Sequence, residues 1–272
     1  MDLTSANAYI ESFAAVLGKT APEWEGRGKL KCGVDLGTAN ICIAVLDEND
    51  KPVSGEIFGA QVVRDGLVYD YSGSVAIVRK LKARIEERLG RRLETAAAAI
   101  PPGTVGRDAE CVANVVRAAD FDVTAVVDEP TAAARALGAK EGAVVDIGGG
   151  TTGISILRNG KVAAVHDEPT GGTHMTLVVA GHYGMSFDEA ERYKVDPANA
   201  REVFPLVKPV AEKMATIVRR FLENWSVETI YAAGGACAFD GFEKIIEREC
   251  GIPTVKPAHS LLVTPLGIAM FG

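Results

Sequence analysis

The stretch AVVDIGGGTT, residues 143–152, decides the fold expected of this chain. Its apolar first part predicts a buried strand, and its three glycines predict that the strand ends in a tight turn. Glycines have no Cβ, so an anion can closely approach the backbone N–H groups of such a turn. Asp146 lies where the strand ends, a position from which a carboxylate could hold Mg²⁺ through water.

The residues after this turn indicate which kind of glycine turn it is. Residues 153–165, GISILRNGKVAAV, alternate between apolar and polar positions and contain Asn159-Gly160, a strong signal for a type I′ hairpin. The turn is therefore expected within an antiparallel meander. This argues against a dinucleotide-binding fold or a Walker-type loop, because both need a helix directly after the glycines.

The same pattern occurs once more near the N-terminus. Residues 30–46, LKCGVDLGTANICIAVL, are again an apolar strand, an aspartate (Asp35), a turn with Gly37 and Thr38, and an alternating strand. A polar turn and a third short strand follow. Two copies of this pattern predict two halves of similar fold. If the two turns face each other, they could hold a polyphosphate from both sides, with Asp35 and Asp146 directed at one metal ion.

Composition limits the classes of partner. The chain has 272 residues, enough for two domains, and its formal net charge of −7 makes nucleic acid an unexpected partner. No apolar run reaches the ~18 residues that span a bilayer, and the N-terminus lacks a signal-peptide pattern. The five cysteines have no CxxC spacing, which favours reduced thiols in a cytoplasmic protein. A zinc site is not expected, because the four histidines have no other ligand at suitable spacing.

Residues 1–28 are predicted to form an N-terminal helix and linker outside the two halves. The helix is indicated by apolar residues at helical spacing, namely Leu3, Ala6, Ile10, Phe13 and Leu17. Pro22 and two glycines follow it. Two interpretations are open at this point: the helix packs on the first domain, or it docks into the groove of a partner.

Strands alternate with helices in the rest of the chain. An amphipathic helix is expected over residues 75–89, with a basic side that faces solvent. Another is expected over 200–225, interrupted by Pro205 and Pro209. Asp128 and Glu129 lie where a strand ends and a helix begins, a frequent position for ligand sites in α/β folds.

Spaced motifs point to a known family. DLGTAN, DEPTAAA, DIGGGTT, GGT, SFDEAERYK, AAGGACAFDGF and TPLGIAMFG follow the order found in the actin-like ATPases. From residue 30 to residue 272 the chain resembles this family, which includes DnaK-type chaperones, MreB, FtsA, PilM and actin. The resemblance implies an α/β fold with two ribonuclease H-like domains, each with a mixed five-stranded sheet and flanking helices, around a nucleotide cleft. The first domain would comprise residues 29–142 and 258–272, and the second residues 143–257.

The resemblance also implies a site for ATP or ADP with Mg²⁺. Asp35 and Asp146 would hold the hydrated Mg²⁺, Glu129 would order the attacking water, and Thr151 would place a hydroxyl near the γ-phosphate. Glu129, Asp146 and Thr151 would thus be the catalytic residues. The residues implied to bind the nucleotide are Asp35, Gly37, Thr38, Ala39, Asn40, Gly148, Gly149, Gly150, Thr151, Thr152, Gly171, Gly172, Thr173, Glu191, Lys194, Gly234, Gly235 and Phe239.

Within this family, the compact length and the ending PLGIAMFG resemble the members that serve ethanolamine utilisation. That resemblance implies a chaperone-like, weak Mg-ATPase in the cytoplasm, associated with ethanolamine ammonia-lyase or with a shell protein of a bacterial microcompartment. Slow hydrolysis is expected, because no lysine between residues 52 and 93 can be assigned to the γ-phosphate. The alternatives are a cytoskeletal or assembly adaptor similar to MreB, FtsA or PilM, and a sugar or acetate kinase.

Overall fold

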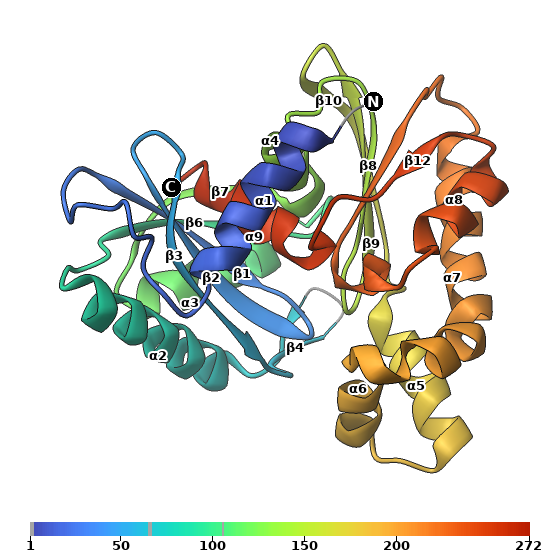
Figure 1. Cartoon of the computed structure of the whole chain (residues 1–272), viewed down its shortest axis with the longest axis horizontal. Coiled ribbons are helices and arrows are strands. Elements are labelled where there is room, and N and C mark those ends of the chain that lie inside the picture. The colour runs from blue at the N-terminus through green and yellow to red at the C-terminus, as the bar shows by residue number, and fades with distance from the viewer. Residues whose placement is uncertain (1–2, 65–66, 105) are drawn as a thin grey trace.

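The computed structural model describes residues 3–64, 67–104 and 106–272, and it confirms the α/β fold with two five-stranded mixed sheets (Figure 1). The first sheet has the order β3-β2-β1-β6-β7 and the second the order β10-β9-β8-β11-β12. The strands of the first sheet are β1 (Leu30–Leu36), β2 (Asn40–Asp47), β3 (Pro52–Gly59), β6 (Thr95–Ile100) and β7 (Asp122–Asp128). Those of the second are β8 (Gly142–Ile147), β9 (Thr152–Arg158), β10 (Lys161–Glu168), β11 (Ile230–Ala233) and β12 (Thr254–Val255). Met1 and Asp2, which begin the predicted N-terminal segment, lie outside the described residues.

The two copies of the sequence pattern form equivalent parts of the two sheets. β1, β2 and β3 are an antiparallel meander, as are β8, β9 and β10, and parallel strands continue each sheet on the other side. The glycine turns connect β1 to β2 and β8 to β9. Asn159 and Gly160 both have positive φ, 53° and 71°, as the predicted type I′ turn between β9 and β10 requires.

Helices cover the sheets and fill the space between them (Figure 1). In the first half these are α2 (Tyr71–Leu89) and α3 (Arg107–Ala118), and a short hairpin, β4 (Val63–Arg64) with β5 (Leu67–Val68), precedes them. The helices of the second half are α5 (Gly172–Tyr183), α6 (Phe187–Val195), α7 (Ala200–Leu222) and α8 (Phe242–Cys250), with single turns of 3₁₀ helix at Pro197–Asn199 and Gly235–Ala238. A third 3₁₀ turn, Ser260–Leu262, follows β12. The apolar residues under each set of helices form a separate core.

Two helices, α4 (Glu129–Leu137) and α9 (Val263–Ala269), lie between the sheets and share a third apolar cluster with residues of both halves. They cross in direct backbone contact, since a Cβ at Gly267 would lie only 1.9 Å from the carbonyl oxygen of Ala132. A Cβ at Gly33 of β1 would lie 2.3 Å from the backbone nitrogen of Ala269. Glycine is thus required at both positions, because any side chain would separate the elements.

α7 runs without a break through Pro205 and Pro209, so the predicted interruption was wrong. Each proline removes a helical hydrogen bond, which usually costs about 3 kcal/mol. One side of this helix is nevertheless buried over its whole length, by Val203, Val207, Ala211, Met214, Ala215, Val218 and Leu222. Burial of this stripe offsets the cost of the prolines, because helices in proteins are stabilised mainly by packing.

The N-terminal helix α1 (Thr4–Val16) packs on the first half against β3. Ile10 and Phe13 are completely buried and Val16 is 6 % exposed. The ring of Phe13 lies against Gly55, where a Cβ would be only 2.7 Å from the ring. Since packing within the chain uses the apolar stripe, the structure favours the first of the two interpretations, a helix docked on its own domain.

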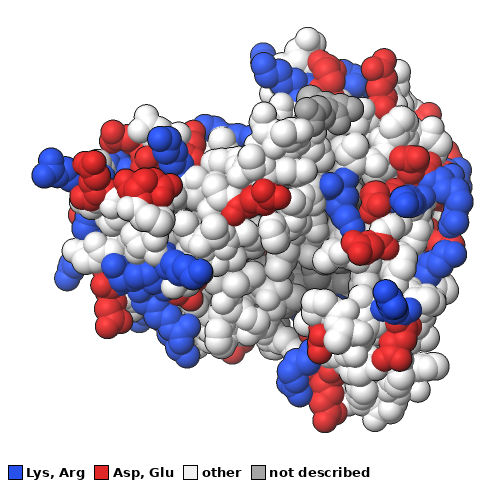
Figure 2. Space-filling model, viewed as in Figure 1, with Lys and Arg blue, Asp and Glu red and all other residues white. Residues whose placement is uncertain are grey.

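Lys and Arg side chains gather over α2 (Figure 2), but they are not all solvated as predicted. Arg88 forms an ion pair with Glu56 and donates a hydrogen bond to Ser54 Oγ at 2.8 Å. Lys82 is buried and donates to the carbonyl oxygen of Asp120. These two cations therefore attach α2 to β3 and to the loop before β7.

Candidate functional site

A cavity of about 550 Å³ lies between the two halves, which is within the usual range for small-molecule sites. Both glycine turns line it, together with the start of α4, the end of α6 and the first turn of α9. It brings together most of the site residues inferred from sequence, namely Asp35, Gly37, Thr38, Ala39, Asn40, Glu129, Asp146, Gly148, Gly149, Gly150, Thr151, Gly172, Glu191, Lys194, Gly234, Gly235 and Phe239. Thr152, Gly171 and Thr173 are not in its lining.

The two glycine turns face each other at close range. A Cβ at Gly149 would lie 3.1 Å from the backbone nitrogen of Ala39 and 3.2 Å from Thr38 Cβ. The second turn is closed by a hydrogen bond from Gly148 N to the carbonyl oxygen of Thr151, at 3.0 Å. In the first turn, a Cβ at Gly37 would lie 2.8 Å from the carbonyl oxygen of Asn40. The first turn therefore requires glycine at position 37, and a side chain at position 149 would press against the first turn.

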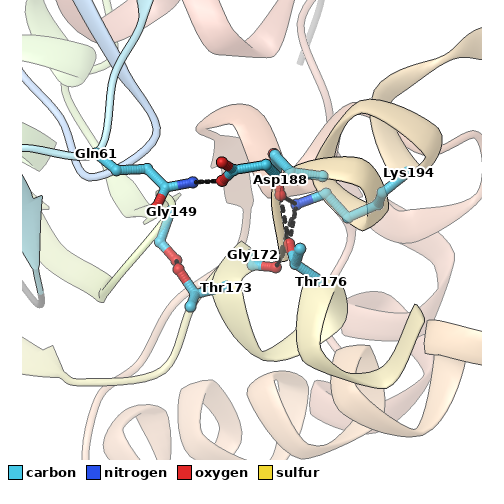
Figure 3. A network of polar contacts seen from close by, with 8 residues as sticks. Gln61, Gly149, Gly172, Thr173, Thr176, Asp188 and Lys194 are labelled. Carbon is cyan, nitrogen blue, oxygen red and sulfur yellow. Dashed lines mark hydrogen bonds and ion pairs between the residues drawn. The ribbon is translucent and has the colours of Figure 1, made fainter. Parts of the chain in front are cut away.

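Thr152, Gly171 and Thr173 lie against or next to the second turn, where a Cβ at Gly171 would be 2.6 Å from the carbonyl oxygen of Gly149. Thr173 donates to the carbonyl oxygen of Gly149 twice, from its backbone N at 2.8 Å and from Oγ1 at 2.7 Å (Figure 3). Gly172 N donates to the carbonyl oxygen of Gly148 at 2.9 Å, and Thr152 Oγ1 to that of Thr170 at 2.6 Å. The first N–H groups of α5 are thus bound to the turn itself, and they fix its shape.

Three carboxylates meet at the cavity because three elements begin or end there. Asp35 is near the end of β1 and Asp146 near the end of β8. Glu129 is the first residue of α4, which begins here because Asp128 accepts a hydrogen bond from Thr131 N at 2.9 Å and Pro130 occupies the first turn. Asp146 also accepts a hydrogen bond from Thr264 Oγ1.

Burial raises the pKa values of all three carboxylates. It raises the pKa of Asp35 to about 7, with a further contribution from the charge of Asp146. It raises the pKa of Asp146 to about 6, although the hydrogen bond from Thr264 acts in the opposite direction. The pKa of Glu129 lies well above its ordinary value because of burial and of the surrounding carboxylates, Asp146, Asp35, Asp167 and Asp128. The ionised forms of these three carboxylates are therefore disfavoured unless a positive charge joins them.

A divalent cation suits this charge distribution. Within the described parts of the chain, no ion pair involves Asp35, Asp146 or Glu129. Oxygen ligands are those that Mg²⁺ prefers, and a cation would favour the ionised forms of Asp35 and Asp146. Among the residues described, no group of three or more His, Cys, Asp or Glu is arranged to hold a metal ion. Asp35 and Asp146 offer two carboxylate donors, a number that suits a cation with several water ligands.

Glu191 and Lys194 of α6 also line the cavity and are paired with each other. Lys194 Nζ donates to Glu191 Oε2 at 2.7 Å, to Thr176 Oγ1 at 2.9 Å and to the carbonyl oxygen of Gly172 at 3.2 Å (Figure 3). Its side chain is only 9 % exposed. Burial lowers the pKa of Lys194, and Glu191 opposes this change. This lysine thus connects α6 to the start of α5, and through it to the second glycine turn.

One contact joins the two halves on the side of the cavity where α6 lies. Gln61, after β3, donates from Nε2 to Asp188 Oδ1 of α6 at 2.6 Å (Figure 3). The two residues are 127 positions apart. Sequence reasoning missed this pair because Gln61 belongs to none of the motifs, and although Asp188 stands in SFDEAERYK, no local pattern predicts its distant partner. Thr264 was also missed, although it stands in the motif TPLGIAMFG, directly before Pro265.

Comparisons with known proteins agree with this fold. The family model described as type IV pilus assembly protein PilM matches residues 107–263, more than half of the chain. The ethanolamine utilization protein EutJ of Salmonella typhimurium is 45 % identical over 241 residues, which is 88 % of this chain and 85 % of that protein. The chain also resembles the crystal structure of EutJ from Carboxydothermus hydrogenoformans, with a TM-score of 0.93 and 46 % identity over the whole of both chains.

A more distant structure shares the fold alone. MreB 5 of Spiroplasma citri, solved bound to AMPPNP, superimposes with a TM-score of 0.70 at 18 % identity and covers 90 % of this chain and 96 % of its own. Separately, the described residues contain no helix whose length and apolar character would let it cross a membrane.

Proposed function

Because this chain belongs to the EutJ family of actin-like ATPases, we propose that it binds Mg-ATP between its two halves and hydrolyses it slowly, as a chaperone-like protein of ethanolamine utilisation. One observation carries the nucleotide part of this proposal: the two glycine turns approach each other across the cavity, the first with half-buried Asp35 and the second with buried Asp146 at its base. We assign residues 29–142 with 258–272 to one domain and 143–257 to the other. The N-terminal residues to position 28 form a separate segment.

The proposed mechanism consists of positioning and electrostatics. Backbone N–H groups of the two turns would hold the phosphates, and Asp35 and Asp146 would hold Mg²⁺ through water. The cation, when bound, neutralises charge on the phosphate oxygens. Glu129 would orient the attacking water and accept its proton, for which a raised pKa is suitable. Glu191, Lys194 and Phe239 would contact the adenosine.

Mg-ATP and Mg-ADP are expected to stabilise the protein against unfolding, since a ligand that binds only the native state shifts the equilibrium by mass action. At 100-fold excess over Kd the gain is about 2.7 kcal/mol. Asp146→Ala should remove most of the stabilisation that depends on Mg²⁺. Thermal unfolding with nucleotide, with and without EDTA, measures this. Asp122→Ala, at an exposed position of β7, is the control and should behave as wild type. Wild-type protein with no shift in either nucleotide would contradict the proposal.

The partner proposal rests on the unequal contacts that ATP and ADP make. Only ATP carries a γ-phosphate for both turns to hold, so it should favour the closed arrangement in which Gln61 contacts Asp188. We propose ethanolamine ammonia-lyase, or a shell protein of its microcompartment, as the partner, in the cytoplasm or at that compartment.

The affinity of the partner should therefore differ between the ATP and ADP forms by about 5- to 150-fold, the usual scale of coupling. Pull-downs with each purified candidate, in ATP analogue, in ADP and without nucleotide, test this. Asp188→Ala should reduce the difference, and Asp35→Ala should abolish it. Equal recovery in all three states would contradict nucleotide gating, and failure to recover either candidate would contradict the choice of partner.

The match to the PilM family model favours a second candidate, an adaptor ATPase of an assembly or cytoskeletal system. Such a protein would share the nucleotide site but would recruit copies of itself or an assembly component. Sedimentation of the purified protein in ATP but not in ADP would favour this candidate.

A further inference from the structure

Asp167 of β10 is a carboxylate that belongs to none of the family motifs and does not line the cavity. Its Oδ1 is buried and has no hydrogen-bond partner among the described residues. A buried acceptor without a partner costs free energy, so its presence needs an explanation.

The strand register places Asp167 beside the catalytic end of the proposed site. Asp167 lies directly opposite Gly153 of β9, so their side-chain positions share one face of the sheet. A Cβ at Gly153 would lie 3.1 Å from Pro130 Cγ and 3.2 Å from Pro102 Cδ. This face therefore packs against the start of α4, next to Glu129. Because residue 153 is glycine, no side chain separates Asp167 from that region.

Electrostatic interactions connect Asp167 to two of the proposed catalytic residues. Burial raises the pKa of Asp167 to about 6, and a hydrogen bond from the Thr151 hydroxyl acts in the opposite direction. The charge of Asp167 in turn contributes to the raised pKa of Glu129. Together with the strand register, these interactions place Asp167 close to Thr151, on the second glycine turn, and to Glu129, on α4.

We propose that Asp167 is a positioning residue for ATP hydrolysis, which accepts a hydrogen bond from Thr151 and holds that hydroxyl in place between the second glycine turn and Glu129. This inference rests on the proposed ATPase function and extends it to a strand outside the family motifs. Gly153 leaves the face between Asp167 and the start of α4 open, and a Cβ there would lie 3.1 Å from Pro130 Cγ.

The test compares Asp167→Asn, Thr151→Val and the double variant, with Glu168→Gln as the control. Glu168 is the next residue in β10, and its side chain is 43 % exposed. For Asp167→Asn, single-turnover hydrolysis should be slower by about 10- to 100-fold, the usual cost of removing a group that orients a functional residue. The Kd for Mg-ADP and the melting temperature should stay near wild-type values. If Asp167 acts through Thr151, the double variant should be no slower than Thr151→Val alone.

Three results would overturn the role of Asp167. The first is unchanged hydrolysis by Asp167→Asn, and the second is a fully additive effect in the double variant. The third is loss of the folded state in both Asp167→Asn and Asp167→Ser, which would make the residue structural. Wild-type protein that binds Mg-ATP but never hydrolyses it would overturn the proposed ATPase activity as well. If wild-type protein hydrolyses ATP and only the variants differ from the expected results, the role of Asp167 alone is contradicted.

Discussion

Glu129→Gln is expected to lower kcat for ATP hydrolysis by about 10²- to 10⁴-fold, the usual contribution of a positioned general base. Glu129 is the first residue of α4 and lines the cavity. None of the ion pairs among the described residues joins it to a lysine or an arginine. Glutamine preserves the size of the side chain but cannot accept a proton from water. The Kd for Mg-ATP should change by less than about threefold, because Glu129 is placed to act on water and not on nucleotide.

Single-turnover hydrolysis measures the chemical step, and equilibrium titration with a non-hydrolysable ATP analogue and Mg²⁺ measures binding. Glu228→Gln is a suitable control, since Glu228 is exposed in the loop before β11. If Glu129→Gln weakened nucleotide binding tenfold and left turnover intact, Glu129 would be a metal or nucleotide contact, and the assignment of the base would be wrong.

Phe13→Ala is expected to lower the free energy of unfolding by about 3–5 kcal/mol, the range for removal of a buried aromatic side chain. Phe13 is fully buried, and its ring covers Gly55 of β3, which has no side chain of its own to fill the space. The substitution would leave a cavity under α1. Chemical denaturation followed by circular dichroism measures the loss, and nucleotide affinity should be unchanged because α1 does not line the site.

Glu11→Ala tests the opposite face of the same helix, where the side chain is exposed, and should cost little. If Phe13→Ala cost less than about 1 kcal/mol, α1 would not be docked in solution. The interpretation as a docking helix for a partner would then be preferred.

Local patterns in the sequence determined the architecture. In each half, an apolar run followed by an aspartate and a glycine turn specifies a strand, its end and a hairpin, because these depend on side-chain periodicity and on the conformational freedom of glycine. The repeat of this pattern predicted two similar halves, and the structure has two sheets with the same strand order. The glycine turns and their aspartates lie on one cavity because equivalent turns of two similar folds face each other.

Only the tertiary structure decided which distant residues meet. Gln61 contacts Asp188 across 127 positions, and Asp167 lies opposite Gly153 through a strand register that no local pattern specifies. Lys82 looked like a solvated cation by helical spacing alone, yet it is buried against the loop before β7. Such contacts depend on how preformed elements pack, and packing is set by the summed burial of apolar surface rather than by any short stretch of chain.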